Sequence, residues 1–230
     1  MRRYVTQGIV LSRTDYGEAD RILTFLTAER GKIKALAKGV RKSKSKLAGG
    51  IELFSVSDLT LILGRGEINT LISSRLARHY GNIVKDLERT KAAYEMMRAV
   101  NRATEDGPER TYFELLDKAL AALDDQKIPL ALNILWLKMQ LLKLAGHTPN
   151  LRTDIEGKKL EELKKYNLDI DKMALSKDSR GRFHASHIKF LRLGFTNHGP
   201  KTLNRIKDVS KLIKTVEPAV ELMFKTFVRI

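Results

Sequence analysis

The 230-residue sequence has no cysteine and no long apolar run. Without cysteine, disulfides and thiolate zinc sites are excluded, which agrees with a reducing compartment. No apolar run approaches the ~18 residues of a membrane-spanning helix, so we expect no membrane partner. Polar residues soon after Met1-Arg2-Arg3 interrupt any apolar stretch of a signal peptide. We therefore expect no secretion signal and a cytoplasmic protein.

Motifs of catalysis are missing as well. The sequence has no P-loop, no nucleophile elbow, no glycine-rich cofactor fingerprint and no paired-carboxylate constellation. His184 and His187 stand three residues apart and could share a helical face, but no carboxylate or cysteine accompanies them at a recognised spacing. Surface or phosphate-contacting roles are favoured for both. We predict no catalytic residue, no metal site and no cofactor, and hence a protein that is not an enzyme.

Positive charge is abundant: 43 Lys and Arg face 27 Asp and Glu, a net charge of +16. Such a surface attracts polyanions, either nucleic acid or acidic protein tails. Residues 1–80 hold 15 basic and 7 acidic residues, so the excess is concentrated there. A ribosome-associated or merely soluble basic protein is the alternative that charge leaves open.

The basic residues are densest between Arg30 and Lys46, where eight basic residues occur and no acidic one. Cations on a glycine-bounded loop can follow a phosphate backbone, and Ser43 and Ser45 can add hydrogen bonds to phosphate. A solvated charge run is the competing interpretation. The predicted DNA-contacting residues are Arg30, Lys32, Lys34, Lys38, Arg41, Lys42, Lys44, Lys46 and Arg65.

The first 80 residues alternate as β-strands do, with turns at glycine. Strands are expected over residues 4–13, 21–27, 32–38, 51–63 and 67–80. Five strands joined by short turns favour a small OB-type barrel, with an SH3-like barrel or half a sandwich as alternatives. Phe25, inside an apolar strand, is expected in the core. Tyr16, in a polar turn, is the better candidate for an exposed platform that stacks on bases.

After Gly81 the apolar spacing becomes helical, which predicts an α+β protein with a helical second half. A helix over residues 130–144 is apolar on several faces and is expected at the centre of that half. A short helix is predicted near Glu156–Tyr166, and helical spacing returns over residues 187–193 and 203–216. A last helix is expected after Pro218.

The first 80 residues contain a series of ordered short runs: Gly8–Leu11, Tyr16–Asp20, Leu23–Thr27, Gly31-Lys32, Ala37–Lys42, Ser45–Leu47, Phe54, Gly64–Gly66 and Leu71. In order and spacing they resemble the N-terminal signature of the RecO family of bacterial recombination mediators. In the second half, Trp136–Pro149 resembles the family's central helix and the turn after it. Many members then carry a four-cysteine zinc module. Here residues 150–183 hold no cysteine, and we expect a metal-free remnant or replacement within 147–185.

The resemblance implies an OB-fold domain over residues 1–80, followed by an α-helical domain over 81–230. It further implies binding of single- and double-stranded DNA, annealing of complementary strands, and work with RecR to load RecA on SSB-coated DNA. The helical domain would recognise the acidic C-terminal tail of SSB. A nucleoid-associated repair protein is therefore expected, and the alternative is another OB-fold module that acts on RNA.

Overall fold

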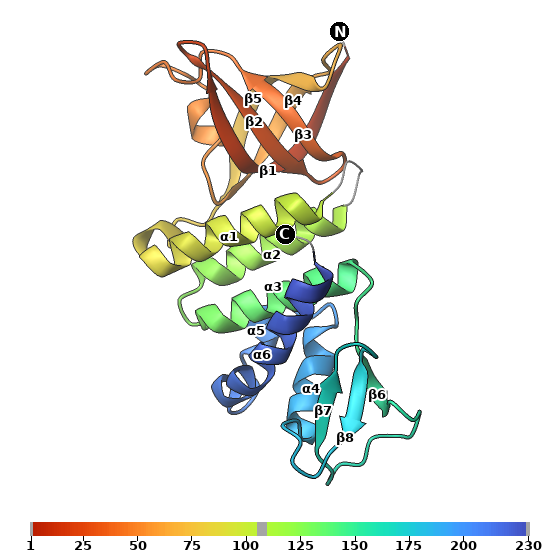
Figure 1. The fold of residues 1–230 in the computed structure, drawn as a ribbon. Coiled ribbons are helices and arrows are strands. Elements are labelled where there is room, and N and C mark those ends of the chain that lie inside the picture. The colour runs from red at the N-terminus through yellow and green to blue at the C-terminus, as the bar shows by residue number, and fades with distance from the viewer. Residues whose placement is uncertain (1, 105–109, 229–230) are drawn as a thin grey trace. The chain divides into compact units, whose positions relative to one another are not determined.

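The computed structural model describes residues 2–104 and 110–228 (Figure 1). Contacts divide the chain into two compact units, unit 1 (residues 1–124) and unit 2 (125–230). Strands give way to helices near residue 80, yet the units divide after Asp124. The predicted domain boundary at residue 80 stays a prediction. Within the described ranges, no helix is long and apolar enough to cross a membrane.

Five strands of unit 1 pair into a closed barrel. They are β1 (Arg3–Tyr16), β2 (Asp20–Thr27), β3 (Gly31–Ala37), β4 (Ser55–Ile62) and β5 (Ile68–His79). Their order is β1-β2-β3-β5-β4, and β1 also pairs with β4. All pairs are antiparallel except that of β3 with β5. A five-stranded β-domain followed by helices confirms the predicted α+β class, and this pairing is consistent with the OB type.

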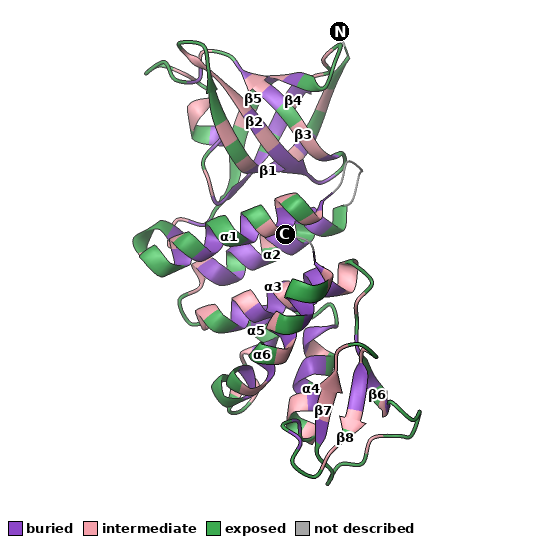
Figure 2. Cartoon of the chain, in the orientation of Figure 1, coloured by how far each residue is buried: buried purple, intermediate pink, exposed green. Residues whose placement is uncertain are grey.

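The barrel core is made by the inward side chains of its strands, and Figure 2 colours the positions of buried residues along these strands purple. Phe25 and Leu59 have no exposed surface, which confirms the expectation for Phe25. A β-bulge in β1 between Val10 and Ser12 lets one long strand pair first with β4 and then with β2. β4 begins four residues later than expected, because residues 51–54 form a bend and a turn in which Phe54 has a φ of +55°.

Two helices of unit 1, α1 (Leu87–Ala103) and α2 (Arg110–Asp124), lie against one end of the barrel (Figure 1). Asp86 caps α1, since its Oδ1 accepts from the Arg89 backbone N–H (3.1 Å). The rings of Phe54 and Tyr94 meet edge to face at 5.2 Å, which joins the segment before β4 to α1. The ring contact ties α1 to the barrel, and α2 contacts β1, β2 and β3, so both helices belong to the same compact unit as the strands.

Unit 2 combines helices with a small sheet. The helices are α3 (Leu130–Leu144), α4 (Ala185–Gly194), α5 (Pro200–Leu203) and α6 (Val209–Phe227), and the strands are β6 (Asn150–Asp154), β7 (Tyr166–Asp169) and β8 (Ala174–Lys177). α3 packs on α4, α5 and α6, with Trp136 and Leu142 almost fully buried. α3 is therefore the buried central helix that its apolar sequence predicts.

The predicted helix near Glu156–Tyr166 is wrong. The Asp154 carboxylate accepts hydrogen bonds from the backbone N–H groups of Glu156 (3.0 Å) and Lys158 (2.8 Å), and Gly157 has a φ of +78°. These local bonds hold a turn in place of a helix. Leu163 is 96% exposed, so the segment also lacks an apolar face that a helix could bury.

The expected separate helix after Pro218 is also wrong, because α6 runs unbroken from Val209 to Phe227 with Pro218 inside it. Proline removes one backbone donor from a helix. Pro218 is exposed, so water can satisfy the carbonyl that loses this partner. The buried residues Val216 and Val220 on either side of it keep the helix packed on unit 2.

The stretch in which we expected a metal-free remnant or replacement of the family's zinc module, residues 147–185, contains a three-stranded sheet of order β6-β8-β7. Within the described residues, no group of three or more His, Asp or Glu side chains is placed to hold a metal. His184 and His187 instead begin α4, where Nδ1 of His187 accepts from the His184 backbone N–H (3.2 Å). Burial and the neighbouring His184 lower the pKa of His187.

Candidate nucleic-acid interface

The basic loop, residues 38–47, leaves β3 at the barrel end that lies away from α1 and α2 (Figure 1). We call this the loop end, and the opposite one the helix end. Two turns shape the loop: the Lys42 N–H donates to the Gly39 carbonyl (3.1 Å), and the Ser45 N–H donates to that of Lys42 (3.0 Å). Val40 is buried and Leu47 half-buried against the barrel core. With its apolar side chains anchored, the loop turns its charged ones outward.

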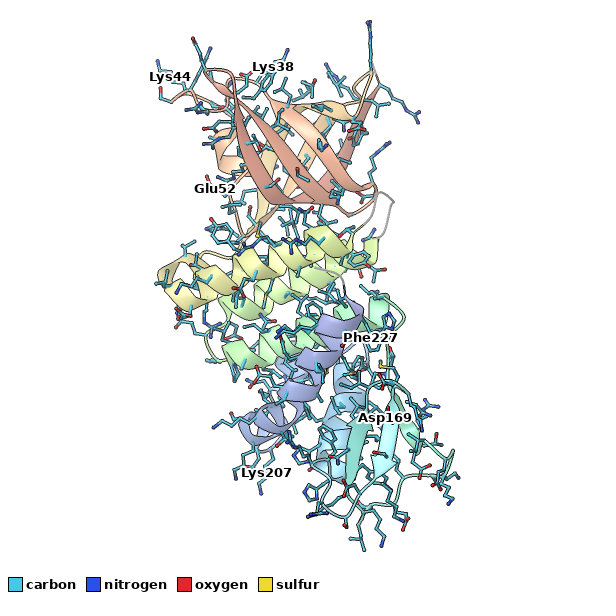
Figure 3. All side chains as sticks on the ribbon, viewed as in Figure 1. Lys38, Lys44, Glu52, Asp169, Lys207 and Phe227 are labelled. Carbon is cyan, nitrogen blue, oxygen red and sulfur yellow. The ribbon has the colours of Figure 1, made fainter. Side chains whose placement is uncertain are left out.

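Five cations of the basic loop are exposed: Lys38, Arg41, Lys42, Lys44 and Lys46. Figure 3 shows Lys38 and Lys44 projecting from the same end of the barrel. Among the described residues, no carboxylate or carbonyl lies within bonding distance of the four lysine ammonium groups. The loop therefore presents charge that the fold itself does not use.

The turn between β1 and β2 is tied to the basic loop. The Arg41 N–H donates to the Ala19 carbonyl (2.9 Å), and the Gly39 N–H donates to Oδ1 of Asp20 (2.7 Å). Asp15 accepts from Nε of Arg21 (2.8 Å) and lies 3.6 Å from the Arg41 guanidinium. The hydrogen bond from Arg21, helped by the charge of Arg41, lowers the pKa of the Asp15 carboxyl. The two segments thus form one surface.

Tyr16 lies within this surface, at the end of β1 and next to Asp15. Its side chain is 55% exposed, although tyrosine commonly buries its ring. The following Gly17 has a φ of +57°, which lets the chain turn tightly beyond the ring. An exposed aromatic ring beside cations is the combination that single-strand-binding surfaces use.

Lys34 and Arg65 lie farther along the barrel. Lys34 projects from β3 opposite Ile68 of β5, and its ammonium is 3.7 Å from the Glu67 carboxylate. Both partners of this ion pair are exposed, so water screens it. Arg65 is exposed in the turn between β4 and β5. Both cations are accessible and can extend the loop-end surface.

Arg30 and Lys32 lie at the opposite end of β3 from the basic loop. The Arg30 guanidinium sits 4.1 Å from the centre of the Tyr4 ring, a cation–π contact. The Lys32 ammonium donates to the carbonyls of Asn101 (3.1 Å) and Thr104 (2.8 Å) at the C-terminal end of α1. The structure therefore does not bring these two predicted residues together with the other seven.

The sequence prediction missed two cations near the loop end. Arg21 pairs with Asp15 across the β1–β2 hairpin and so enters the surface beside Arg41. Arg2 lies beside the turn that carries Arg65, because the Leu63 N–H donates to the Arg2 carbonyl (3.0 Å). A hairpin turn at Gly17 places Arg21 opposite Asp15 on the neighbouring strand. This cross-strand pairing is the signal in the sequence that could have identified Arg21.

Models of the two halves of one family match the chain. "Recombination protein O N terminal" matches residues 1–80, and "Recombination protein O C terminal" matches residues 84–190. The chain is 35% identical over 150 residues to a DNA repair protein RecO of Dehalococcoides mccartyi, covering 65% of this chain and 58% of that protein. It is 30% identical over 197 residues to DNA repair protein RecO of Gloeothece citriformis, covering 80% of this chain and 69% of that protein.

Proposed function

The chain belongs to the RecO family, whose relatives are DNA repair proteins, and on that premise we propose that the loop end of its barrel binds DNA. The match spans only 58% of the length of the first relatives, so the activity of the whole protein is part of this proposal. A single observation carries it. The basic loop presents four lysine ammonium groups without a partner among the described residues, beside an exposed tyrosine.

The proposed mechanism is non-enzymatic. Cations of the basic loop and its neighbours neutralise phosphates and release counterions, which supplies affinity without sequence preference. Tyr16 stacks on an unpaired base and adds a preference for single strands. Two strands whose phosphates are partly neutralised repel each other less, so pairing can begin. The chain thereby anneals complementary strands at the nucleoid.

Partner proteins complete the proposal. We infer that unit 2 docks RecR and the acidic C-terminal tail of SSB, so that RecA is loaded on SSB-coated DNA. Unit 2 holds 21 basic and 11 acidic residues, an excess that favours an acidic tail. Annealing of SSB-coated strands should be faster with intact SSB than with SSB that lacks its tail. Equal rates would contradict the role of the tail and leave DNA binding untouched.

Affinity measured against salt tests the DNA-binding function. Fluorescence anisotropy with a labelled single strand and a matched duplex gives the dissociation constant at several salt concentrations. If about six phosphates are contacted, the log–log slope for single strands is about −4. A flat salt response would contradict the proposal. Much tighter binding of matched RNA, without DNA annealing, would favour the RNA-binding module instead.

A further inference from the structure

A second basic surface lies in unit 2, where α5 meets the start of α6. We call residues 200–214 the α5–α6 corner. Its cations are Lys201, Arg205, Lys207, Lys211 and Lys214, all exposed, and its one acidic residue is Asp208. Asp208 is engaged with Lys211 at 3.3 Å. Figure 3 shows Lys207 projecting from this part of the chain.

The corner has a charge excess that another lysine-rich segment of unit 2 lacks. Residues 156–165 also carry four lysines, but three glutamates accompany them. Ion pairs there join Lys158 to Glu156 (2.6 Å) and Lys177 to Glu161 (2.6 Å). At the corner, in contrast, Arg205, Lys207 and Lys214 have no acidic partner among the described residues. If the positive charge served solubility alone, we would expect no such contrast between paired and unpaired cations.

A packed scaffold holds the corner. Leu203 and Val216 have no exposed surface, and Ile213 is 3% exposed. The Asn204 side-chain amide donates to the Lys127 carbonyl (3.0 Å), which fixes the corner to the segment before α3 and adds Lys127, another exposed cation. Because the apolar side chains of α6 face inward, Lys211 and Lys214, three residues apart, share its outer face.

The surroundings of these cations favour a phosphate backbone over an acidic peptide. Thr202 and Ser210 are exposed among them, and hydroxyl groups donate readily to phosphate oxygens. None of the exposed large apolar side chains of the described residues falls within the corner. Peptide recognition usually depends on a buried apolar or aromatic anchor, which this surface does not offer.

We propose that the α5–α6 corner binds the phosphate backbone of a second DNA strand while the loop end of the barrel holds the first. The proposal rests on the DNA-binding function proposed above. The corner lies outside residues 84–190, which the C-terminal family model matches. With no exposed aromatic ring, it takes single strands and duplexes alike. One protein chain then carries both strands of an annealing pair.

Counting strands per protein chain tests this second site. Two short single strands that are not complementary are mixed with the full chain, and native mass spectrometry counts the chains and strands in each complex. The wild type should hold two strands per chain. In Arg205/Lys207/Lys214→Glu, which leaves the Lys211–Asp208 pair intact, second-strand affinity should fall at least about tenfold, and its salt slope by about 2. First-strand affinity should change less than about threefold, because the loop end is untouched.

The matched control is Lys159/Lys164/Lys165→Glu, which makes the same charge change at exposed lysines of a balanced segment. It should keep second-strand binding, and circular dichroism checks that both variants fold. If the wild type binds one strand but never a second, or the corner variant still holds two, the inference is overturned and the proposed function stands. If the wild type binds no strand, the proposed function itself fails. Displacement of the second strand by a glutamate peptide, more readily than by DNA, would reassign the corner to an acidic protein partner.

Discussion

The two ends of the barrel carry similar residues but use them differently. At the helix end, Lys32 donates to the carbonyls of Asn101 and Thr104 where α1 ends, and the Tyr80 hydroxyl donates to the Asp117 carboxylate of α2 at 2.5 Å. At the loop end, the lysines of the basic loop have no such partners among the described residues, and Tyr16 is 55% exposed. Cations and tyrosines that look alike in the sequence hold the fold at one end and are available to a ligand at the other.

This difference teaches that basic character alone does not mark a DNA contact. A lysine whose charge is satisfied by helix carbonyls has already exchanged water for protein acceptors, and a phosphate would have to displace them. A lysine that still faces water loses little when it meets a phosphate and gains from counterion release. The two ends therefore differ in whether their lysines already have hydrogen-bond acceptors within the protein.

Charge reversal of the basic loop should have the largest effect. In Arg41/Lys42/Lys44/Lys46→Glu, single-strand affinity should fall about a thousandfold at ~50 mM salt, because about four phosphate contacts become repulsive. The anisotropy titration measures this. Reversal of the exposed unit 2 residues Lys159, Lys164, Lys165 and Lys172 is the matched control. Similar losses in both variants would mean that net charge, and no particular surface, governs binding.

The next largest effect compares two lysines of β3, Lys32 at the helix end and Lys34 farther along the strand. Lys32→Met should lower the free energy of unfolding of unit 1 by about 2 kcal/mol, since two charge-assisted hydrogen bonds at a helix C-terminus are lost. Lys34→Met should change stability by less than about 0.5 kcal/mol, because its exposed ion pair is screened, but weaken DNA binding a few fold. Hydrogen exchange of barrel amides measures the stability of unit 1. Tryptophan fluorescence would not, because the single tryptophan, Trp136, lies in unit 2. A stability loss in Lys34→Met but not in Lys32→Met would contradict the distinction between the two ends.

Tyr16 tests whether the loop end distinguishes single strands from duplexes. Tyr16→Ala should weaken single-strand binding about tenfold, as loss of one stacked base does, with duplex affinity unchanged. Tyr16→Phe should restore it, because the ring stacks and the hydroxyl does not. Equal losses for single strand and duplex would assign Tyr16 to the structure of the turn. Paired anisotropy titrations give the ratio directly.

The smallest expected effect concerns Tyr80 and alkaline pH. Burial, followed by the hydrogen bond to Asp117, raises the pKa of Tyr80 from 10.0 to about 12. The unfolded chain releases this proton near pH 10, whereas the folded one keeps it to about pH 12. The stabilisation is thus full below pH 10 and is lost as pH rises through 12. Between pH 9 and 11 the wild type should lose about 1 kcal/mol more stability than Tyr80→Phe. Parallel losses, measured by hydrogen exchange of the barrel, would contradict this.

Much of the fold could be predicted because the signals are local. Alternating apolar residues and glycine turns predicted the five strands. Phe25 is buried and Tyr16 is exposed, as expected. The failures also have local causes that apolar spacing does not capture. The Asp154 carboxylate accepts hydrogen bonds from the backbone N–H groups of Glu156 and Lys158, which hold a turn where a helix was expected. α6 continues through Pro218 because buried residues on both sides of the proline pack on unit 2.

The sequence by itself determined the family resemblance, the α+β class and the basic loop, because short-range pattern and composition are sufficient for each. Only the tertiary structure decided which cations are available. Lys32 finds its acceptors 69 and 72 residues away in the chain, at Asn101 and Thr104. No local pattern encodes a partner at that separation, since it is set by where α1 ends against the barrel. The tertiary structure also gathered the cations of the α5–α6 corner on one packed scaffold in unit 2.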